Sequence, residues 1–155
     1  MKWAIKTQRL FDGMERPLVH DALVVIEDER IVAVGPAAQA ALPADIAVLD
    51  VGDRLVMPGM IDAHVHILWS GSVSSGQESR VATDSQALLM GVRNAQVALK
   101  SGLTTVRDCG DRHYLSLALR DCITHGDLAG PRLLCSGPVI TSTAGRNTAK
   151  VTLCL

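Results

Sequence analysis

The feature that most constrains this chain is the alternation of strand-like and helix-like segments in its second part. In chain order these are an apolar run at 59–67, a helical pattern at 83–100, a strand-like run at 103–108, a helical pattern at 112–125 and a strand-like run at 132–137. Strands and helices that alternate at this spacing favour right-handed βαβ units, whose strands pair in parallel. The sequence therefore predicts an α/β fold from about residue 56 onward.

The helical pattern at 83–100 has clear start and stop signals. Thr83 and Gln86 have the spacing of a capping box, and Gly102 follows the last periodic residue. Four apolar residues recur at helical spacing between these signals: Leu88, Val92, Ala95 and Leu99. We therefore expect an amphipathic helix that packs one face on the sheet.

Residues 1–55 have a different pattern. Short β-prone runs at 3–7, 22–26, 30–34 and 46–50 are separated by turn-forming or charged segments. The two apolar runs within 22–34 flank a compact charged turn, which predicts a β-hairpin. A small β-rich domain is therefore expected before the α/β part.

Composition excludes several classes of function. The formal net charge is -1 and the four aromatic residues are scattered, so no nucleic-acid surface is expected. Lys6 and Arg9 interrupt any apolar signal-peptide core, and the longest stretch without acidic or basic residues, 63–77, contains four serines and two histidines. The four cysteines have no C-x-x-C spacing. These features predict a cytoplasmic protein with reduced, mostly buried thiols and no membrane partner.

The run VMPGMIDAHVH, at 56–66, ends in two histidines one residue apart. Because side chains alternate along a strand, His64 and His66 would point to the same face of an extended 59–67 segment. The opposite face would carry four apolar residues for the helices to cover: Ile61, Ala63, Val65 and Ile67. Two imidazoles at the carboxyl end of a parallel strand form half of a metal site, although paired histidines can also be satisfied or solvent-facing residues.

Three ordered segments resemble the metal-dependent amidohydrolases. PGMIDAHVH, at 58–66, is similar to their first barrel strand, and SGLTTVRDCG, at 101–110, is similar to the second. LRDCITHGDLAGPRLLCSGPVIT, at 119–141, resembles the third βα unit of the imidazolonepropionase-like and Xaa-Pro dipeptidase-like branch. The β-rich start, with IVAVG and a strand leading into MPG, is similar to the small β-sandwich domain of that family.

The resemblance implies an incomplete (β/α)8 barrel of about three βα units after a partial β-sandwich domain. The expected ranges are 1–55 for the sandwich part, 56–145 for the barrel part and 146–155 for a divergent tail. The family's lysine, two further histidines, metal-binding aspartate and proton-transferring carboxylate come from later strands, and Lys150 lies in no matching segment. Because the resemblance ends abruptly at about Gly145, we expect either a frameshift or premature stop, or else a natural short variant or an assembly error, and a chain that is inactive alone.

The resemblance also implies a reaction. Family members hydrolyse C–N bonds of small amides, cyclic amides or dipeptides with one or two divalent metals, so His64 and His66 would be metal ligands. The metal, zinc by default, would lower the pKa of a bound water and polarise the scissile carbonyl. Two alternatives stay open for the chain itself: a non-catalytic remnant or interaction module with open strand edges that self-associate, or half of a split enzyme.

Three weaker candidates for the site follow the first two barrel strands. Trp69, with the Ser/Gly-rich loop at 67–77, would either line the substrate mouth or belong to a mobile connection. Asp108 would either support a metal ligand or belong to the active site itself, or it would be the N-cap of the next helix. Arg107 is expected to pair structurally.

The remaining histidines and one loop are assigned more simply. His113 and His125 are expected on the outward surface of the second helix, and His20 has no evident partner in the β-rich domain. The segment at 141–145 follows the third strand and would meet substrate in a complete enzyme.

Overall fold

The computed structural model describes residues 1–37 and 46–139. The chain divides into two compact units, Met1–Pro58 and Gly59–Leu155, which we describe separately. The predicted tail at 146–155, Lys150 and the 141–145 segment lie outside the described residues. The domain boundary predicted from the sequence therefore stays a prediction.

The first unit is one five-stranded sheet. Its strands are β1 (Lys2–Leu10), β2 (Val19–Glu27), β3 (Arg30–Pro36), β4 (Ala47–Asp50) and β5 (Leu55–Val56). The path is β3-β2-β1-β4, with β5 also paired to β1; β2 is antiparallel to both β1 and β3, and β4 and β5 run parallel to β1. The predicted hairpin is confirmed, because Glu27 pairs with Arg30 across the charged turn. A second layer that would make a sandwich stays a prediction.

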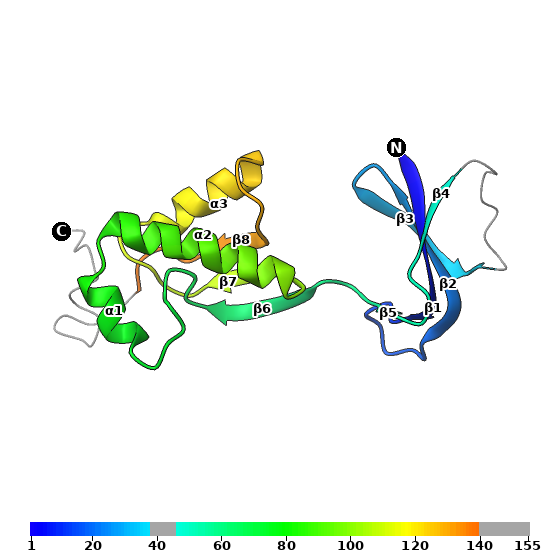
Figure 1. Ribbon diagram of the computed structural model, residues 1–155, viewed down its shortest axis with the longest axis horizontal. Coiled ribbons are helices and arrows are strands. Elements are labelled where there is room, and N and C mark those ends of the chain that lie inside the picture. The colour runs from blue at the N-terminus through cyan, green and yellow to red at the C-terminus, as the bar shows by residue number, and fades with distance from the viewer. Residues whose placement is uncertain (38–45, 140–155) are drawn as a thin grey trace. The chain divides into compact units, whose positions relative to one another are not determined.

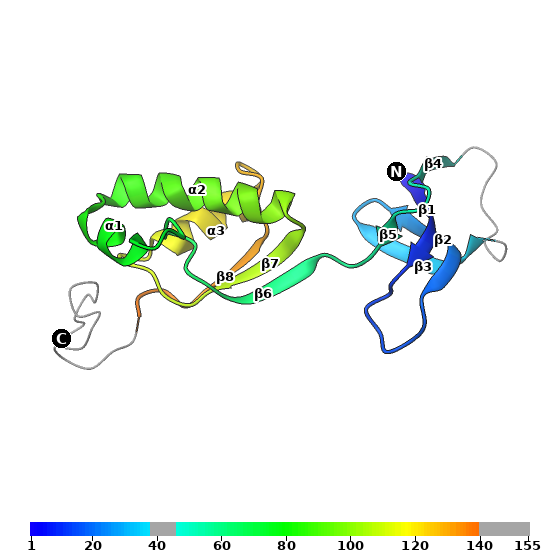
Figure 2. The same ribbon diagram turned by 60° about the horizontal axis from the view of Figure 1, so that its bottom comes forward.

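The second unit has a parallel sheet covered by helices. Its elements are β6 (Met60–Val65), α1 (Ser75–Val81), α2 (Asp84–Lys100), β7 (Leu103–Asp108), α3 (Leu115–His125) and β8 (Arg132–Cys135). The sheet order is β6-β7-β8 with parallel pairing throughout, as the βαβ pattern predicts. Figures 1 and 2 show α2 and α3 lying over the same face of this sheet.

The core of the second unit lies between the helices and this sheet face. Ala95 of α2 and Leu119 of α3 pack against Val106 of β7 and Leu133 of β8, and all four are nearly inaccessible to solvent. Burying apolar surface of this kind is the main force that holds a helix on a sheet. The core therefore fixes the strand ends from which the candidate site is built.

The predicted capping box at the start of α2 is confirmed. The Gln86 backbone N–H donates to the Thr83 hydroxyl at 3.2 Å, and the Thr83 backbone N–H donates to the Gln86 side-chain oxygen at 2.8 Å. These reciprocal bonds satisfy two N–H groups that a helix start would otherwise leave unpaired.

The face assignment along β6 is wrong for its first half. Ile61 is 72% exposed and Ala63 is also exposed, whereas Val65 and Ile67 pack into the helix-covered core. The pairing of β6 with β7 is irregular here: β7 has one extra residue between the Met60 and Ile61 pairings, and β6 has one extra residue between the Asp62 and Val65 pairings. Irregularities of this kind bend a strand and increase its local twist.

Two helix assignments also need correction. The helix expected at 112–125 begins at Leu115, because His113 and Tyr114 have φ values of 53° and 59°, outside the right-handed helical region. The Ser/Gly-rich segment, taken from the sequence as a loop, leads into the short helix α1. His113 therefore lies on the loop before α3, and only His125 lies on the helix itself.

Two predictions from composition, on membrane spans and on cysteines, can be compared with the described residues. None of their helices is both long and apolar enough to cross a bilayer. Three of the four cysteines lie in this part of the chain, and they are free and half-buried: Cys109, Cys122 and Cys135. The sequence predicts deeper burial than these thiols show.

Candidate metal centre

The two histidines at the end of β6 lie side by side. The ring centroids of His64 and His66 are 5.5 Å apart, and the ring planes meet at 79°. His64 is exposed and His66 is half-buried. Two imidazoles at this separation can turn toward a common point in front of the strand end.

The backbone of β6 is irregular where it carries these two histidines. The Asp62 carboxylate accepts the His64 backbone N–H at 3.0 Å. The Ala63 carbonyl accepts the Arg107 Nε–H at 2.7 Å and contacts the Cys109 thiol at 3.6 Å. Side chains therefore replace part of the backbone ladder at this irregularity, and Arg107 has a structural partner, as expected.

A backbone carbonyl holds the ring of His66. The Nδ1 atom lies 3.1 Å from the Gly110 carbonyl oxygen. Because a carbonyl oxygen only accepts, this hydrogen bond requires the proton on Nδ1 and leaves the lone pair on Nε2. Metal-binding histidines in proteins are oriented by this kind of second hydrogen bond, so His66 fits a metal ligand through Nε2.

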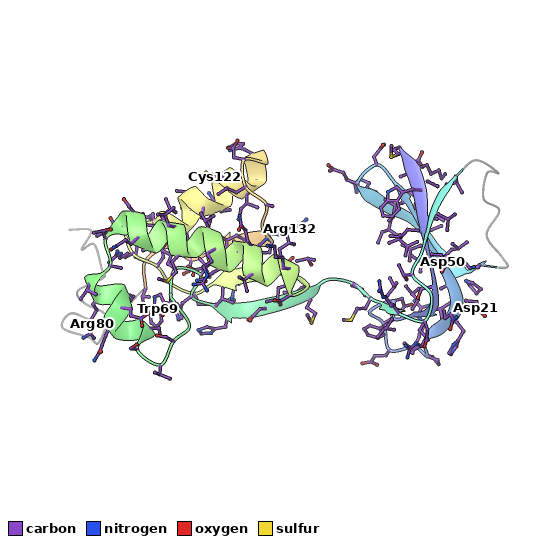
Figure 3. All side chains as sticks on the ribbon, viewed as in Figure 1. Asp21, Asp50, Trp69, Arg80, Cys122 and Arg132 are labelled. Atoms are coloured by element: carbon purple, nitrogen blue, oxygen red, sulfur yellow. The ribbon has the colours of Figure 1, made fainter. Side chains whose placement is uncertain are left out.

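Trp69 covers the other side of the same ring. Its indole stacks on the His66 imidazole with centroids 4.5 Å apart and planes 18° from parallel, and Figure 3 shows it on the loop beyond β6, beside α1. The Asn94 side chain on α2 anchors this loop by donating to the carbonyls of Ile67 at 2.8 Å and Trp69 at 2.7 Å. The sequence pattern gave no sign of this role for Asn94. Substrate contact by Trp69 stays a prediction.

Asp108 holds two backbone segments next to His66, the one that follows it in the chain and the one that contains Gly110. Its fully buried carboxylate accepts the Ile67 N–H at 2.9 Å and the Gly110 N–H at 3.3 Å. Burial raises the pKa of Asp108 above its ordinary value, while the two N–H donors and the nearby His66 act against this shift. Asp108 therefore orders the segments that carry His66 and the carbonyl it contacts.

The alternative role of Asp108 as a helix N-cap is wrong. α3 begins seven residues later, at Leu115, and its first turn is held by another carboxylate. Asp111 accepts the Ser116 backbone N–H at 2.7 Å, and Asp111 is itself nearly fully buried. A carboxylate near a helix N-terminus also complements the helix dipole.

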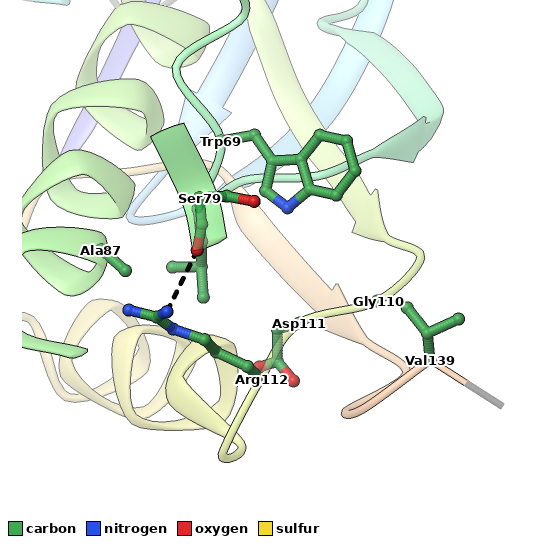
Figure 4. Close-up of a pocket in the computed structure, with 8 residues that line it drawn as sticks. Trp69, Ser79, Ala87, Gly110, Asp111, Arg112 and Val139 are labelled. Atoms are coloured by element: carbon green, nitrogen blue, oxygen red, sulfur yellow. Dashed lines mark hydrogen bonds between the residues drawn. The ribbon is translucent and has the colours of Figure 1, made fainter. Parts of the chain in front are cut away.

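A small pocket adjoins Trp69 at the same end of the sheet. Its cavity volume is about 20 Å³, and Figure 4 shows its lining around Trp69, Ser79, Asp111 and Arg112. Of the lining residues, Gly110 also supplies the carbonyl that holds His66. Gly110 therefore contributes both to the pocket and to the position of the histidine pair.

The other histidines do not join the pair. His113 pairs with Asp84 at 2.8 Å, His125 ends α3, and His20 lies on β2 of the first unit. Within 1–37 and 46–139, no three or more His, Cys, Asp or Glu side chains are grouped so that they could hold a metal ion. Among the described residues, the centre therefore has two candidate ligands, His64 and His66.

Comparisons with known proteins agree with the motifs. The model of the amidohydrolase family matches residues 55–154. An imidazolonepropionase from Micrococcus luteus is 45% identical over 73 residues, which are 47% of this chain and 18% of that protein. An imidazolonepropionase from Streptomyces griseus is 31% identical over 115 residues, 74% of this chain and 29% of that protein. The chain thus spans less than a third of either relative.

Solved structures share the fold. A prolidase complexed with N-methylphosphonate-L-proline aligns with a TM-score of 0.79 and 28% identity, over 96% of this chain and 35% of that chain. Molinate hydrolase aligns with a TM-score of 0.77 and 29% identity, over 90% of this chain and 30% of that chain. A Xaa-Pro dipeptidase with bound methionine gives 0.75 and 27%, over 90% and 34%. The mixed α/β fold of this chain matches that of these hydrolases.

Proposed function

Because this chain belongs to the amidohydrolase family, we propose that His64 and His66 supply two ligands of a divalent metal centre in an enzyme that hydrolyses C–N bonds. The observation that carries the proposal is the geometry of His66. Its Nδ1 proton is committed to the Gly110 carbonyl, so Nε2 is left to bind a metal beside the ring of His64.

The residues of this chain hold the ligands in place. Asp108 fixes the backbone that follows His66, Asn94 anchors the loop that follows, and Trp69 limits rotation of the imidazole by stacking on it. Nitrogen donors of this kind favour zinc, although other divalent transition metals accept them. When bound, such an ion supplies a Lewis acid that activates water and polarises a carbonyl.

The substrate class follows from the relatives. Imidazolonepropionases and prolidases are among the matching proteins, so we propose a small amide, cyclic amide or dipeptide as substrate. The remaining metal ligands and the carboxylate that transfers protons are proposed to come from barrel strands beyond the three described here. The proposed activity is therefore that of a barrel of full family length, in the cytoplasm.

Metal titration of the 155-residue chain tests the ligand assignment. We expect zinc binding by calorimetry after removal of bound metal with a chelator, and a loss of affinity in His64→Gln and in His66→Gln. Each loss should be at least the 10–100-fold typical of removing a residue that hydrogen-bonds to a metal ligand. His125→Gln is the matched control, because this histidine ends α3 away from the pair. Equal zinc affinity in all four proteins would remove the basis of the proposal.

Open strand edges suggest a second property of the chain. Among residues 1–37 and 46–139, β6 and β8 are the edge strands of the three-stranded sheet, and edges with unpaired N–H and C=O groups recruit further strands. We propose that the chain self-associates through these edges. Light scattering after size exclusion should then show a mass that rises with concentration, and a monomer at every concentration would contradict this.

A further inference from the structure

Arg112 lies where three segments of the second unit meet. Its guanidinium donates to the Ser79 carbonyl at 3.1 Å, a contact drawn in Figure 4, and to the Ala82 carbonyl at 2.5 Å. Its Nε lies 3.1 Å from the Asp84 carboxylate. One side chain, 15% exposed, thus contacts the end of α1 and the start of α2.

The backbone of Arg112 leads directly to the carbonyl that holds His66. Gly110, two residues earlier, accepts the Nδ1 proton of His66. Between them, the Asp111 N–H donates to the Gly137 carbonyl at 3.0 Å, and the Asp111 carboxylate accepts the Ser116 N–H. The path of the chain from Arg112 back to Gly110 is therefore held at each residue.

The side chain of Arg112 is also connected with Trp69, the residue whose ring stacks on His66. It holds the carbonyl of Ser79, and Ser79 lines the same pocket as Trp69. In Figure 4 the Ser79 hydroxyl points toward the indole ring of Trp69, the ring that stacks on His66. Arg112 is consequently connected with both the carbonyl and the aromatic ring that orient His66.

We propose that Arg112 is a positioning residue that sets the tautomer and orientation of His66, which rests on the proposed role of His66 as a metal ligand. The planar guanidinium presents several donors in a fixed fork, so it holds two carbonyls and a carboxylate together. A lysine ammonium at this position has a compact charge and keeps only part of these contacts. Arg112 thereby couples the packing of α1 and α2 to the direction of the His66 lone pair.

Nitrogen-15 NMR of the metal-free, full 155-residue chain tests this directly. At a pH where His66 is neutral, two-bond correlations of its ring should show the proton on Nδ1 in the natural sequence. We expect Arg112→Met to mix the two tautomers and Arg112→Lys to retain part of the Nδ1–H form. Arg120→Met is the matched control, because Arg120 lies on α3 and pairs only with the adjacent Asp121 in the described contacts.

Zinc titration of the same proteins gives a second readout. A loss of about tenfold in Arg112→Met would support the proposal, with a smaller loss in Arg112→Lys; tenfold is the lower end of the range for removing a residue that orients a metal ligand. Unchanged tautomer and unchanged affinity in folded Arg112→Met would overturn it. Should this variant fail to fold, Asp84→Asn weakens the same junction with fewer lost contacts, and an unchanged His66 tautomer there would overturn it as well.

The two readouts also separate this inference from the proposed function. A shifted tautomer in the Arg112 variants, in a chain whose zinc affinity does not depend on His66, would support the positioning role and reject the metal role. Zinc binding that depends on His66 but is the same in the folded Arg112 variants, with the tautomer unchanged, would support the metal role of His66 and reject the positioning role of Arg112.

Discussion

Gly110→Ala is predicted to destabilise the second unit strongly. Gly110 has φ +147°, a backbone conformation that residues with a side chain rarely adopt, and its added Cβ would come within 2.2 Å of the Val139 Cγ2 atom. Backbone strain of this kind costs about 1–3 kcal/mol, and forcing a methyl group into occupied space costs about 1–3 kcal/mol more. The expected decrease in the free energy of unfolding is about 2–6 kcal/mol.

Gly126→Ala is the matched control for this substitution. Gly126 also has a positive φ, +85°, but nothing lies within 4 Å of its added Cβ. Only the strain of a left-handed residue remains, about 1–2 kcal/mol, and both substitutions share an offset of about 0.4–1 kcal/mol from a less flexible unfolded chain. Urea unfolding followed by circular dichroism measures both changes. Equal destabilisation by the two substitutions would refute the argument that close contact with Val139 requires a glycine at 110.

Two further predictions concern the core and the buried carboxylate of the second unit. Leu119→Ala should lower the free energy of unfolding by about 2–5 kcal/mol, because the Leu119 side chain is 1% exposed. Leu89→Ala should change it by about 0.5 kcal/mol or less, because the Leu89 side chain is 70% exposed. Comparable losses of stability in thermal unfolding of the two variants would contradict this prediction. Because the pKa of Asp108 is raised in the folded chain, the folded state binds its proton more readily than the unfolded state does, so this group adds stability as pH falls from above the raised value toward the ordinary 3.8. Asp108→Asn should remove this contribution. The urea midpoints of the metal-free variant and of the metal-free natural sequence should then depend differently on pH. Identical pH profiles would contradict the raised pKa.

Regular elements of the second unit could be predicted because their signals are local. The capping box at Thr83 and the apolar spacing along α2 act within a few turns of one helix, so the sequence alone indicates them. The parallel order β6-β7-β8 follows from the βαβ rule, which applies to consecutive segments. The start of α3 could not be read in this way, because the left-handed conformations of His113 and Tyr114 end the helical pattern earlier than its apolar spacing does.

The pair of histidines could be predicted as chemistry but not as geometry. Residue identity and the period of a strand are enough to bring His64 and His66 to one face. The register shifts along β6 depend on how it pairs with β7, a partner more than forty residues later in the chain. The expected coverage is wrong for Ile61 and Ala63, whereas the burial of Val65 and Ile67 and the proximity of the two rings agree with the structure.

The orientation of His66 depends on residues that no motif around it identifies. Gly110 lies 44 positions later and contributes a backbone carbonyl, a group that every residue has and that no sequence pattern distinguishes. Asn94 and Arg112 act through carbonyls in the same way, and their effect exists only after α2 and the loop following β7 have packed. A histidine becomes a defined metal ligand when its second nitrogen is fixed, since only then does the first present its lone pair in one direction. In this chain the strand supplies the two rings, and contacts distant in sequence determine whether they can act as one site.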